Sequence, residues 1–435
     1  MMNTIFWGLM LTGFSAQALL PCETVLLVNT NSQDSLKIAA NFAAMRKLPQ
    51  QNIIHLGADE TQHQITQEKF AEQVWEPVQK ELKERGLDGH VLAWIYSAGF
   101  PYRVKTTAGK MSITGLTFTR NTVPEKRKVG KVSTMIYFSP LFRGPGDTQE
   151  QQAKITLSLD RFKQGLKNNM PIPAMMLGYT GKHGNTVEEV IESLKNGLRG
   201  DNTRPARGVH FVKTSDLHRS APREWQFNPV QLELAERTIE ATTTTNFPAH
   251  AENTWGLMTG QAHIVTEKIP TFVPGAMADH LTSFAATFDK NEQTKCSEWI
   301  RAGATATAGT VTEPYSIWWK FPHARFFTHY SHGCTILESF AQSILNPTQT
   351  LCLGEPFCRP WRSGLGVKLI GFPRTPISEE RTVTALCHPQ PRHPMKYTFF
   401  IDGKQVQAES PNASLRINPA GLSDGYHEFC AVAKV

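Results

Sequence analysis

Polar side chains that could carry out chemistry gather around a strand-like run of small residues, Ala302–Val311. The group consists of His263, Asp279, His280, Thr282, Ser283 and Glu313. A hydroxyl nucleophile needs a base within hydrogen-bond reach and usually a third group that orients the base. Ser283 or Thr282 could be the nucleophile, and either histidine could be the base, with one of the two carboxylates as the orienting group.

The same residues also have a purely structural interpretation. Asp279 can cap a turn, His280 can bond to the backbone, and the two hydroxyls can satisfy a strand end. Glu313 can be a buried carboxylate paired with a basic residue such as Arg301 or Arg219. The spacing does not decide between these interpretations, because the chain lacks a Gly-x-Ser-x-Gly nucleophile elbow here.

A second polar segment, SDLHRSAPREW, carries Asp216, Arg219 and Arg223. Arginine binds carboxylates through two parallel hydrogen bonds, so these residues could form an anion- or carboxylate-binding patch. They could equally form a structural network of ion pairs. Both interpretations remain open on the sequence alone.

The seven cysteines do not show the Cys-x-x-Cys spacing of a zinc site. In an exported protein we expect disulfides, with Cys387–Cys430 as the first candidate pair and Cys352–Cys358 as the second. The HYSHGC segment ending at Cys334 could bind metal, but we expect a surface turn that leads into a helix over Thr335–Ile344. We therefore predict no metal site and no cofactor.

Composition and charge restrict the class of protein. The chain has 435 residues, of which 40% are hydrophobic and 19% charged, as in a folded globular protein large enough for two or three domains. The net charge of +7 is scattered. Basic residues do not alternate with aromatic ones along a stripe, so we do not expect a nucleic-acid partner.

The first 18 residues resemble a secretory leader. An apolar run over Ile5–Phe14 is too short to cross a bilayer, and Ala16-Gln17-Ala18 gives the small-x-small pattern of a cleavage site. Cys22 could suggest a lipoprotein, but the proline before it is a poor match. We expect an exported protein, periplasmic or extracellular, without a membrane span in the mature chain. Its partners, if any, would be envelope or exported proteins.

Alternating strands and helices predict an α/β domain over residues 19–375. Continuous apolar runs at Thr24–Asn29 and Val91–Tyr96 are typical of strands buried on both faces. Amphipathic helices are expected between such strands, for example over Gln67–Arg85. This order favours a mainly parallel sheet with helices on both faces. Short strands separated by Asp-Gly and Pro-Asn turns predict an antiparallel β-sandwich over residues 380–435.

Several segments resemble an uncharacterised exported bacterial family found in organisms that carry the exosortase sorting system. The matching segments include VLLVNTNSQDSLKIAANFAAMRKLPQQNI, GVHFVKTSDLHRSAPREW, ADHLTSF, WIRAGATATAGTVTEPY, LGEPFCRPW and DGYHEFCAVA. They spread over most of residues 24–433. The resemblance implies export but no particular reaction.

The order of motifs is also similar, more distantly, to the gingipain branch of the caspase-like peptidases. VLAWIYSAGFP resembles an early strand of that fold, GATATAGTVTEPY its Gly-Ala strand, and LGEPFCRP its terminal Gly-Asp-Pro. This sequence departs from the pattern where catalysis takes place. Gln261 stands where the family has its histidine, and Thr282-Ser283 stand where it has its cysteine. The resemblance therefore implies a degenerate domain that binds or assists, with a Ser/Thr hydrolase near Ser283 as the alternative.

Overall fold

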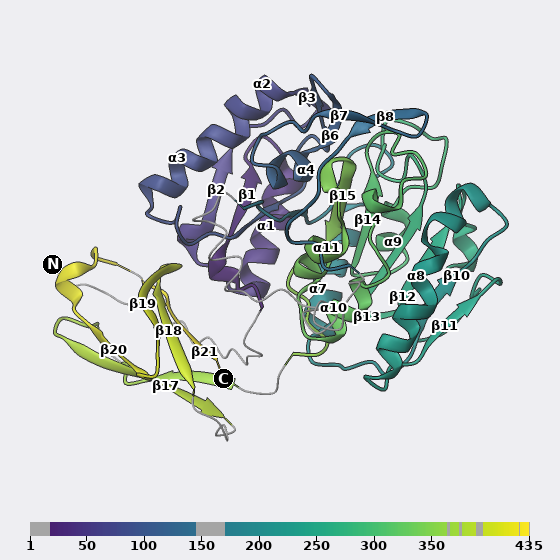
Figure 1. The fold of residues 1–435 in the computed structure, drawn as a ribbon. Coiled ribbons are helices and arrows are strands. Elements are labelled where there is room, and N and C mark those ends of the chain that lie inside the picture. The colour runs from purple at the N-terminus through teal and green to yellow at the C-terminus, as the bar shows by residue number, and fades with distance from the viewer. Residues whose placement is uncertain are drawn as a thin grey trace.

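The computed structural model describes residues 18–144, 170–362, 366–373, 376–388, 395–425 and 427–434. They form a large α/β domain and a smaller β module beside its N-terminal half (Figure 1). Apart from Ala18, the predicted leader lies outside the described residues. The segment Lys154–Leu159, whose sequence KITLSL predicts a strand, lies outside them as well.

A ten-stranded sheet runs through the α/β domain in the order β11-β10-β12-β13-β14-β15-β9-β4-β1-β2. Neighbouring strands of this sheet are parallel, except that β14 and β15 are antiparallel. The predicted mostly parallel sheet is confirmed. The strands are β1 (Thr24–Asn29), β2 (Ile53–Leu56), β4 (Ala93–Tyr96), β9 (Ala174–Met176), β10 (Val209–Val212), β11 (Ala241–Thr244), β12 (Thr254–Gly260), β13 (Phe272–Leu281), β14 (Ala306–Thr310) and β15 (Thr350–Gly354).

The antiparallel pair at the centre divides the sheet into two halves that run in opposite directions. In each half the first strand along the chain, β1 or β10, lies between the second and the third. The carboxyl ends of β10 to β14 therefore meet at one edge of the sheet, and those of β1, β2, β4 and β9 meet at the opposite edge. Residues that follow β4 and residues that follow β13 leave the sheet at different edges.

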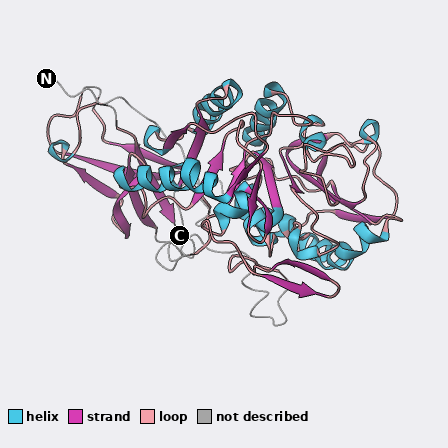
Figure 2. Ribbon diagram, turned by 90° about the horizontal axis from the view of Figure 1, so that it is seen from above, coloured by secondary structure: helices cyan, strands magenta, loops and turns pink. Residues whose placement is uncertain are grey.

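Apolar side chains on both faces of the strands fix the layers. In β1, Leu26 and Val28 belong to one hydrophobic cluster, and Val25 and Leu27 belong to the other. Helices therefore cover both faces, as expected (Figure 2). The first cluster is completed by α1 (Gln33–Arg46), α7 (Val187–Gly200), α8 (Leu217–Ala235), α10 (Phe326–Ser331) and α11 (Ile336–Ser343). The second hydrophobic cluster contains side chains from the helices α2 (Gln67–Phe70), α3 (Glu76–Glu84) and α9 (Ser297–Arg301) and from most of α4 (Ile113–Phe118). It also contains side chains from a small three-stranded sheet, which consists of β3 (Gln64–Thr66), β5 (Arg103–Thr106) and β6 (Gly109–Ser112). A separate hairpin joins β7 (Lys126–Val129) to β8 (Val132–Met135).

Ser32 caps α1, because its side chain accepts a hydrogen bond from the Ser35 amide. Helix α8 begins at Leu217 and contains two prolines, Pro222 and Pro229. One local expectation needs correction. The HYSHGC segment is not a surface turn: its first residues belong to α10, which is buried along its whole length.

Two three-stranded antiparallel sheets make up the terminal module. They follow the orders β16-β17-β20 and β19-β18-β21 and enclose a shared apolar core, as predicted for a sandwich. The module begins before the predicted boundary at residue 375, because β16 pairs with β17. The strands are β16 (Gly366–Ile370), β17 (Arg381–His388), β18 (Lys396–Ile401), β19 (Lys404–Ser410), β20 (Ser414–Ile417) and β21 (Phe429–Lys434).

The small-residue strand β14 allows a close approach of backbones, as its sequence indicates. A Cβ added at Gly309 would lie 2.8 Å from the Ala286 nitrogen and 2.9 Å from Ala285. Both neighbours belong to the segment that follows β13. The absence of a side chain at this position therefore lets that segment lie directly on the strand.

We predict that Gly309→Ala destabilises the domain by about 1–3 kcal/mol, because the added methyl group displaces backbone in a packed core. Denaturant unfolding of the purified chain measures this cost. The control is Gly89→Ala, since no atom lies within 4 Å of a Cβ added at Gly89. Equal stability of the two variants would contradict the close approach.

Candidate functional site

The candidate site lies at the edge of the sheet where β10, β12 and β13 end. Gly260 at the end of β12 pairs with Leu281 at the end of β13, so Gln261 and Thr282 follow neighbouring strand ends. The chain passes from β10 through α8 to β11 on one side and then to β12 on the other side. Such a reversal of strand order is where open α/β sheets place their ligands. The first turn of α8 closes over this point, because a Cβ at Gly260 would meet the Arg219 carbonyl at 2.1 Å.

A buried ion pair joins α8 to the two strands beneath it. Arg223 Nη1 lies 2.7 Å from Asp279 Oδ1, and both side chains are 1% exposed. The second nitrogen of Arg223 donates to the Thr259 carbonyl at 2.7 Å. Burial raises the pKa of the Asp279 carboxyl, and the Arg223 charge acts against that shift. These two residues have a structural place in the fold, within strand β13 and helix α8, and not in an open turn.

The ring of His280 is fully engaged inside the domain. Trp299 Nε1 donates to His280 Nδ1 at 2.9 Å, and Nε2 lies 3.1 Å from the Thr294 carbonyl. Because a carbonyl only accepts, Nε2 carries the proton. Burial lowers the pKa of His280 to about 3. The histidine therefore stays neutral near pH 7 and has no free nitrogen with which to take a proton from Ser283 or Thr282.

The buried Thr282 hydroxyl joins two polar side chains at the end of β13. Its hydroxyl donates to Gln293 Oε1 at 2.8 Å and accepts from Arg219 Nε at 3.0 Å. Arg219 also pairs with Asp216 at 2.8 Å, and the two side chains are 27% and 29% exposed. The structure thus brings together three residues singled out in the sequence, Asp216, Arg219 and Thr282. Thr282 is buried, and the partly exposed side chains of Asp216 and Arg219 are the ones that solvent and a ligand can reach.

Ser283 contacts a carboxylate and not an imidazole. Its Oγ donates a hydrogen bond to Glu313 Oε1 at 2.9 Å. Glu313 Oε1 also accepts a hydrogen bond from the Tyr315 amide at 2.8 Å. Glu313 does not make the predicted structural pair, since Arg301 bonds to Glu189 and Glu298 instead.

Two predicted residues lie just beyond β12. Gln261 is half-buried and His263 is exposed. Neither forms a hydrogen bond with the hydroxyls at the end of β13, whose partners are Arg219, Gln293 and Glu313. The serine, histidines and carboxylates singled out in the sequence, all within the described part of the chain, are therefore not assembled into one hydrogen-bonded triad.

The cysteines do not supply a reactive thiol at this edge. Cys296 is fully buried, and burial raises its pKa to about 12. Burial also raises the pKa of Cys334, whose sulfur accepts from Gln342 at 3.3 Å. A thiol at such a pKa is not the thiolate that catalysis requires.

All seven cysteines are free thiols in the structure. The expected Cys387–Cys430 bond is not formed, and the Cys387 sulfur lies 3.8 Å from the Tyr397 hydroxyl instead. The expected Cys352–Cys358 bond is not formed either. Both of these sulfurs are buried in the main core, where Cys358 packs against Tyr330 and Gly275.

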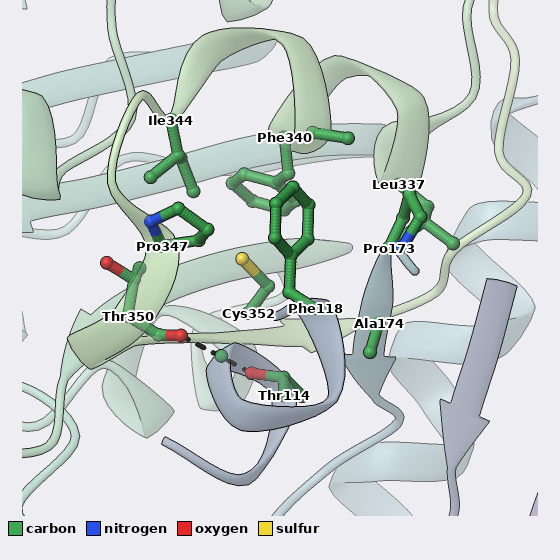
Figure 3. Close-up of a pocket in the computed structure, with 12 residues that line it drawn as sticks. Thr114, Phe118, Pro173, Ala174, Leu337, Phe340, Ile344, Pro347, Thr350 and Cys352 are labelled. Atoms are coloured by element: carbon green, nitrogen blue, oxygen red, sulfur yellow. Dashed lines mark hydrogen bonds between the residues drawn. The ribbon is translucent and has the colours of Figure 1, made fainter. Parts of the chain in front are cut away.

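The described residues hold no group of three or more His, Cys, Asp or Glu side chains that could bind a metal ion. None of their helices is long and apolar enough to cross a membrane. A cavity of about 20 Å³ lies between α4, α11, β9 and β15 (Figure 3), with room for about one water molecule. None of the residues that line it belongs to the strand-end site.

No protein-family model, curated protein or solved structure matches the chain. The family resemblances described above therefore rest on the sequence motifs alone.

Some residues of the site had no signal in the sequence. Gln293 receives hydrogen bonds from the Thr282 hydroxyl and the Phe284 amide, yet it sits in an ordinary polar loop. Trp299 fixes His280 from a helix 19 residues away. Both contacts depend on how the segment after β13 folds back over the sheet, and no local pattern encodes that path.

We predict that Asp279→Ala destabilises the protein by about 3–5 kcal/mol, because it leaves Arg223 buried without its partner. The control is Asp216→Ala, which opens a half-exposed pair and should cost less than about 1 kcal/mol. Urea unfolding measures both. The double variant Asp279→Leu/Arg223→Met should recover most of the loss, and a double variant no better than Asp279→Ala would count against a pairwise origin.

The neutral His280 also predicts a pH dependence of stability. Its pKa is about 3 in the folded protein and about 6.5 in an unfolded chain. Between these values the unfolded chain binds more protons, so stability is full above about pH 6.5 and falls as the pH decreases toward 3. His280 contributes a slope of up to about 1.4 kcal/mol per pH unit.

His280→Asn should remove this contribution from the free energy of unfolding measured between pH 5.5 and 4.5. Asparagine is chosen because its side-chain oxygen can still accept from Trp299. The control is His263→Asn, which changes an exposed ring. An unchanged slope in His280→Asn would show that the buried histidine is not the titrating group.

Proposed function

We propose that this chain is an exported binding or accessory protein of the cell envelope, built on a caspase-like domain that has lost its hydrolytic site. The motif order described above supports the caspase-like part of the proposal. In that comparison the ends of β12 and β13 correspond to the places of the catalytic histidine and cysteine. This chain has Gln261 and Thr282 there, at neighbouring strand ends.

The observation that carries the proposal is the state of His280. A hydrolase at this edge would need a base beside its nucleophile. The nearest histidine in the sequence to Ser283 is buried, neutral and hydrogen-bonded through both nitrogens. What remains accessible is a polar surface with donors and acceptors: the guanidinium of Arg219 and the carboxylates of Asp216 and Glu313.

A surface of this kind fits an extended stretch of polypeptide, whose backbone offers both N–H and C=O groups. Arg219 is the group best suited to a carboxylate, either of a side chain or of a chain end. The predicted leader supports partners among envelope or exported proteins. The mature chain would meet them after export.

One observation favours a second candidate function, a hydrolase with Ser283 as nucleophile. The Ser283 hydroxyl already donates to the Glu313 carboxylate at 2.9 Å, so this carboxylate could act as the base. Hydrolysis by this pair would not involve a histidine or a thiol, and thiol-directed inhibitors would not affect it.

A peptide library tests both candidates with the purified exported chain. We expect retention of peptides without cleavage, and a loss of affinity of about tenfold or more in Arg219→Ala, because a hydrogen bond to a charged group is removed. The control is Arg416→Ala, which removes an exposed arginine of the terminal module. Mass spectrometry of the bound and unbound peptides reports cleavage.

The outcomes separate the candidates. Cleavage that is lost in Ser283→Ala and in Glu313→Gln would establish the hydrolase and refute the proposal. Retention that is equal in Arg219→Ala and Arg416→Ala would place the binding surface elsewhere than at this strand edge.

A further inference from the structure

A cysteine in the last strand of the β module lies in the same buried cluster as a cysteine near the start of the described chain. Cys22 lies in the short helical turn Pro21–Glu23, which leads into β1, and Cys430 lies in β21. The two side chains are 2% and 5% exposed, and both belong to the hydrophobic core cluster of the module. Residues from opposite ends of the chain thus share one buried environment.

Strand register shows that Cys430 faces the α/β domain. Cys430 pairs directly with Phe400 of β18, and opposed residues of antiparallel strands point to the same face. The Phe400 ring lies 4.9 Å from the ring of His90 in the α/β domain. The Leu92 amide donates to the Glu23 carbonyl at 2.7 Å, so the segment beside His90 runs next to Cys22.

The two thiols meet within this contact. A hydrogen bond between the Cys22 and Cys430 side chains is the largest cause of the raised pKa of Cys22. Cys387, the partner expected for Cys430, is directed elsewhere, because its sulfur lies 3.8 Å from the Tyr397 hydroxyl.

We infer that Cys22 and Cys430 form a disulfide bond that fastens the terminal module to the beginning of β1. Each thiol gives up a proton, two electrons leave the pair, and one S–S bond forms. The oxidant is a disulfide of glutathione or of a thiol–disulfide oxidoreductase, which accepts the two electrons and is released as thiols.

Burial determines when the bond forms. A thiolate attacks in thiol–disulfide exchange, and the closed contact keeps both sulfurs away from solvent and from the oxidant. The bond therefore forms while the module docks and is then enclosed. Once formed, it resists reduction until the module separates from the domain.

The experiment uses the full chain from residue 19 onward, refolded in a glutathione redox buffer, so its result does not depend on export. Free thiols are alkylated with a maleimide in denaturant at mildly acidic pH, without reduction, so that buried thiols are exposed and exchange is suppressed. Peptides are then mapped by mass spectrometry. We expect a linked peptide containing Cys22 and Cys430, alkylated cysteines elsewhere, and an intact mass lower by about 2 Da than that of the reduced chain.

Matched variants keep the inference testable if one of them folds poorly. Cys22→Ser and Cys430→Ser should each lose the 2 Da difference and melt at a lower temperature than the oxidised parent, whereas Cys387→Ser should keep the linked peptide. Under reducing conditions the parent should lose its advantage over Cys22→Ser. A Cys387–Cys430 peptide, or alkylation of both Cys22 and Cys430 in the oxidised chain, would overturn the inference. Peptide mapping of the protein isolated after export gives one further outcome: a lipid attached to Cys22 would overturn the inference.

Discussion

The geometry of the strand-end site depends on the buried ion pair between Arg223 and Asp279. Arg219 and Arg223 are four residues apart in α8 and so lie on the same face of the helix. Arg223 enters the core and bonds to β12 and β13. Arg219 lies one helical turn earlier, at the edge of the sheet, where its Nε donates a hydrogen bond to the Thr282 hydroxyl. The buried pair thus positions the exposed polar surface, and its carboxylate is committed to structure and not to chemistry.

The opposed directions of the two half-sheets place a second reversal of strand order at the other edge, between β1 and β4. That position is closed by its own side chains. Asn29 Nδ2 donates to the Gly99 carbonyl at 2.5 Å, and a Cβ at Gly99 would meet Ser32 at 2.4 Å. The same topological feature therefore gives a filled junction in one half and a half-exposed polar surface in the other. The difference comes from the charged residues at the start of α8.

The sequence predicts best what depends on neighbouring residues. The buried runs at β1 and β4, the amphipathic pattern over Gln67–Arg85 and the turns of the module all have local signals, and the structure contains each of these elements. No such local signal marks the antiparallel pair β14 and β15, because the apolar sequence of a buried strand does not show whether the strand runs parallel or antiparallel to its neighbour. Asp216, Arg219 and Thr282 were each singled out in the sequence, in two separate groups, and the structure brings them together. The environments of His280 and Cys296 were not predictable, since both depend on the segment after β13 folding back over the sheet.

The state of the His280 ring can be measured most directly by nuclear magnetic resonance on the full chain labelled with ¹⁵N-histidine. His280→Asn assigns the signals. The predicted result is a neutral ring from pH 7.5 to 5, with the proton on Nε2 and an unprotonated Nδ1 that accepts from Trp299. A ring that gains a proton with a midpoint near pH 6–7 would contradict the structural role of His280, because such a histidine could serve Ser283 or Thr282 as a base.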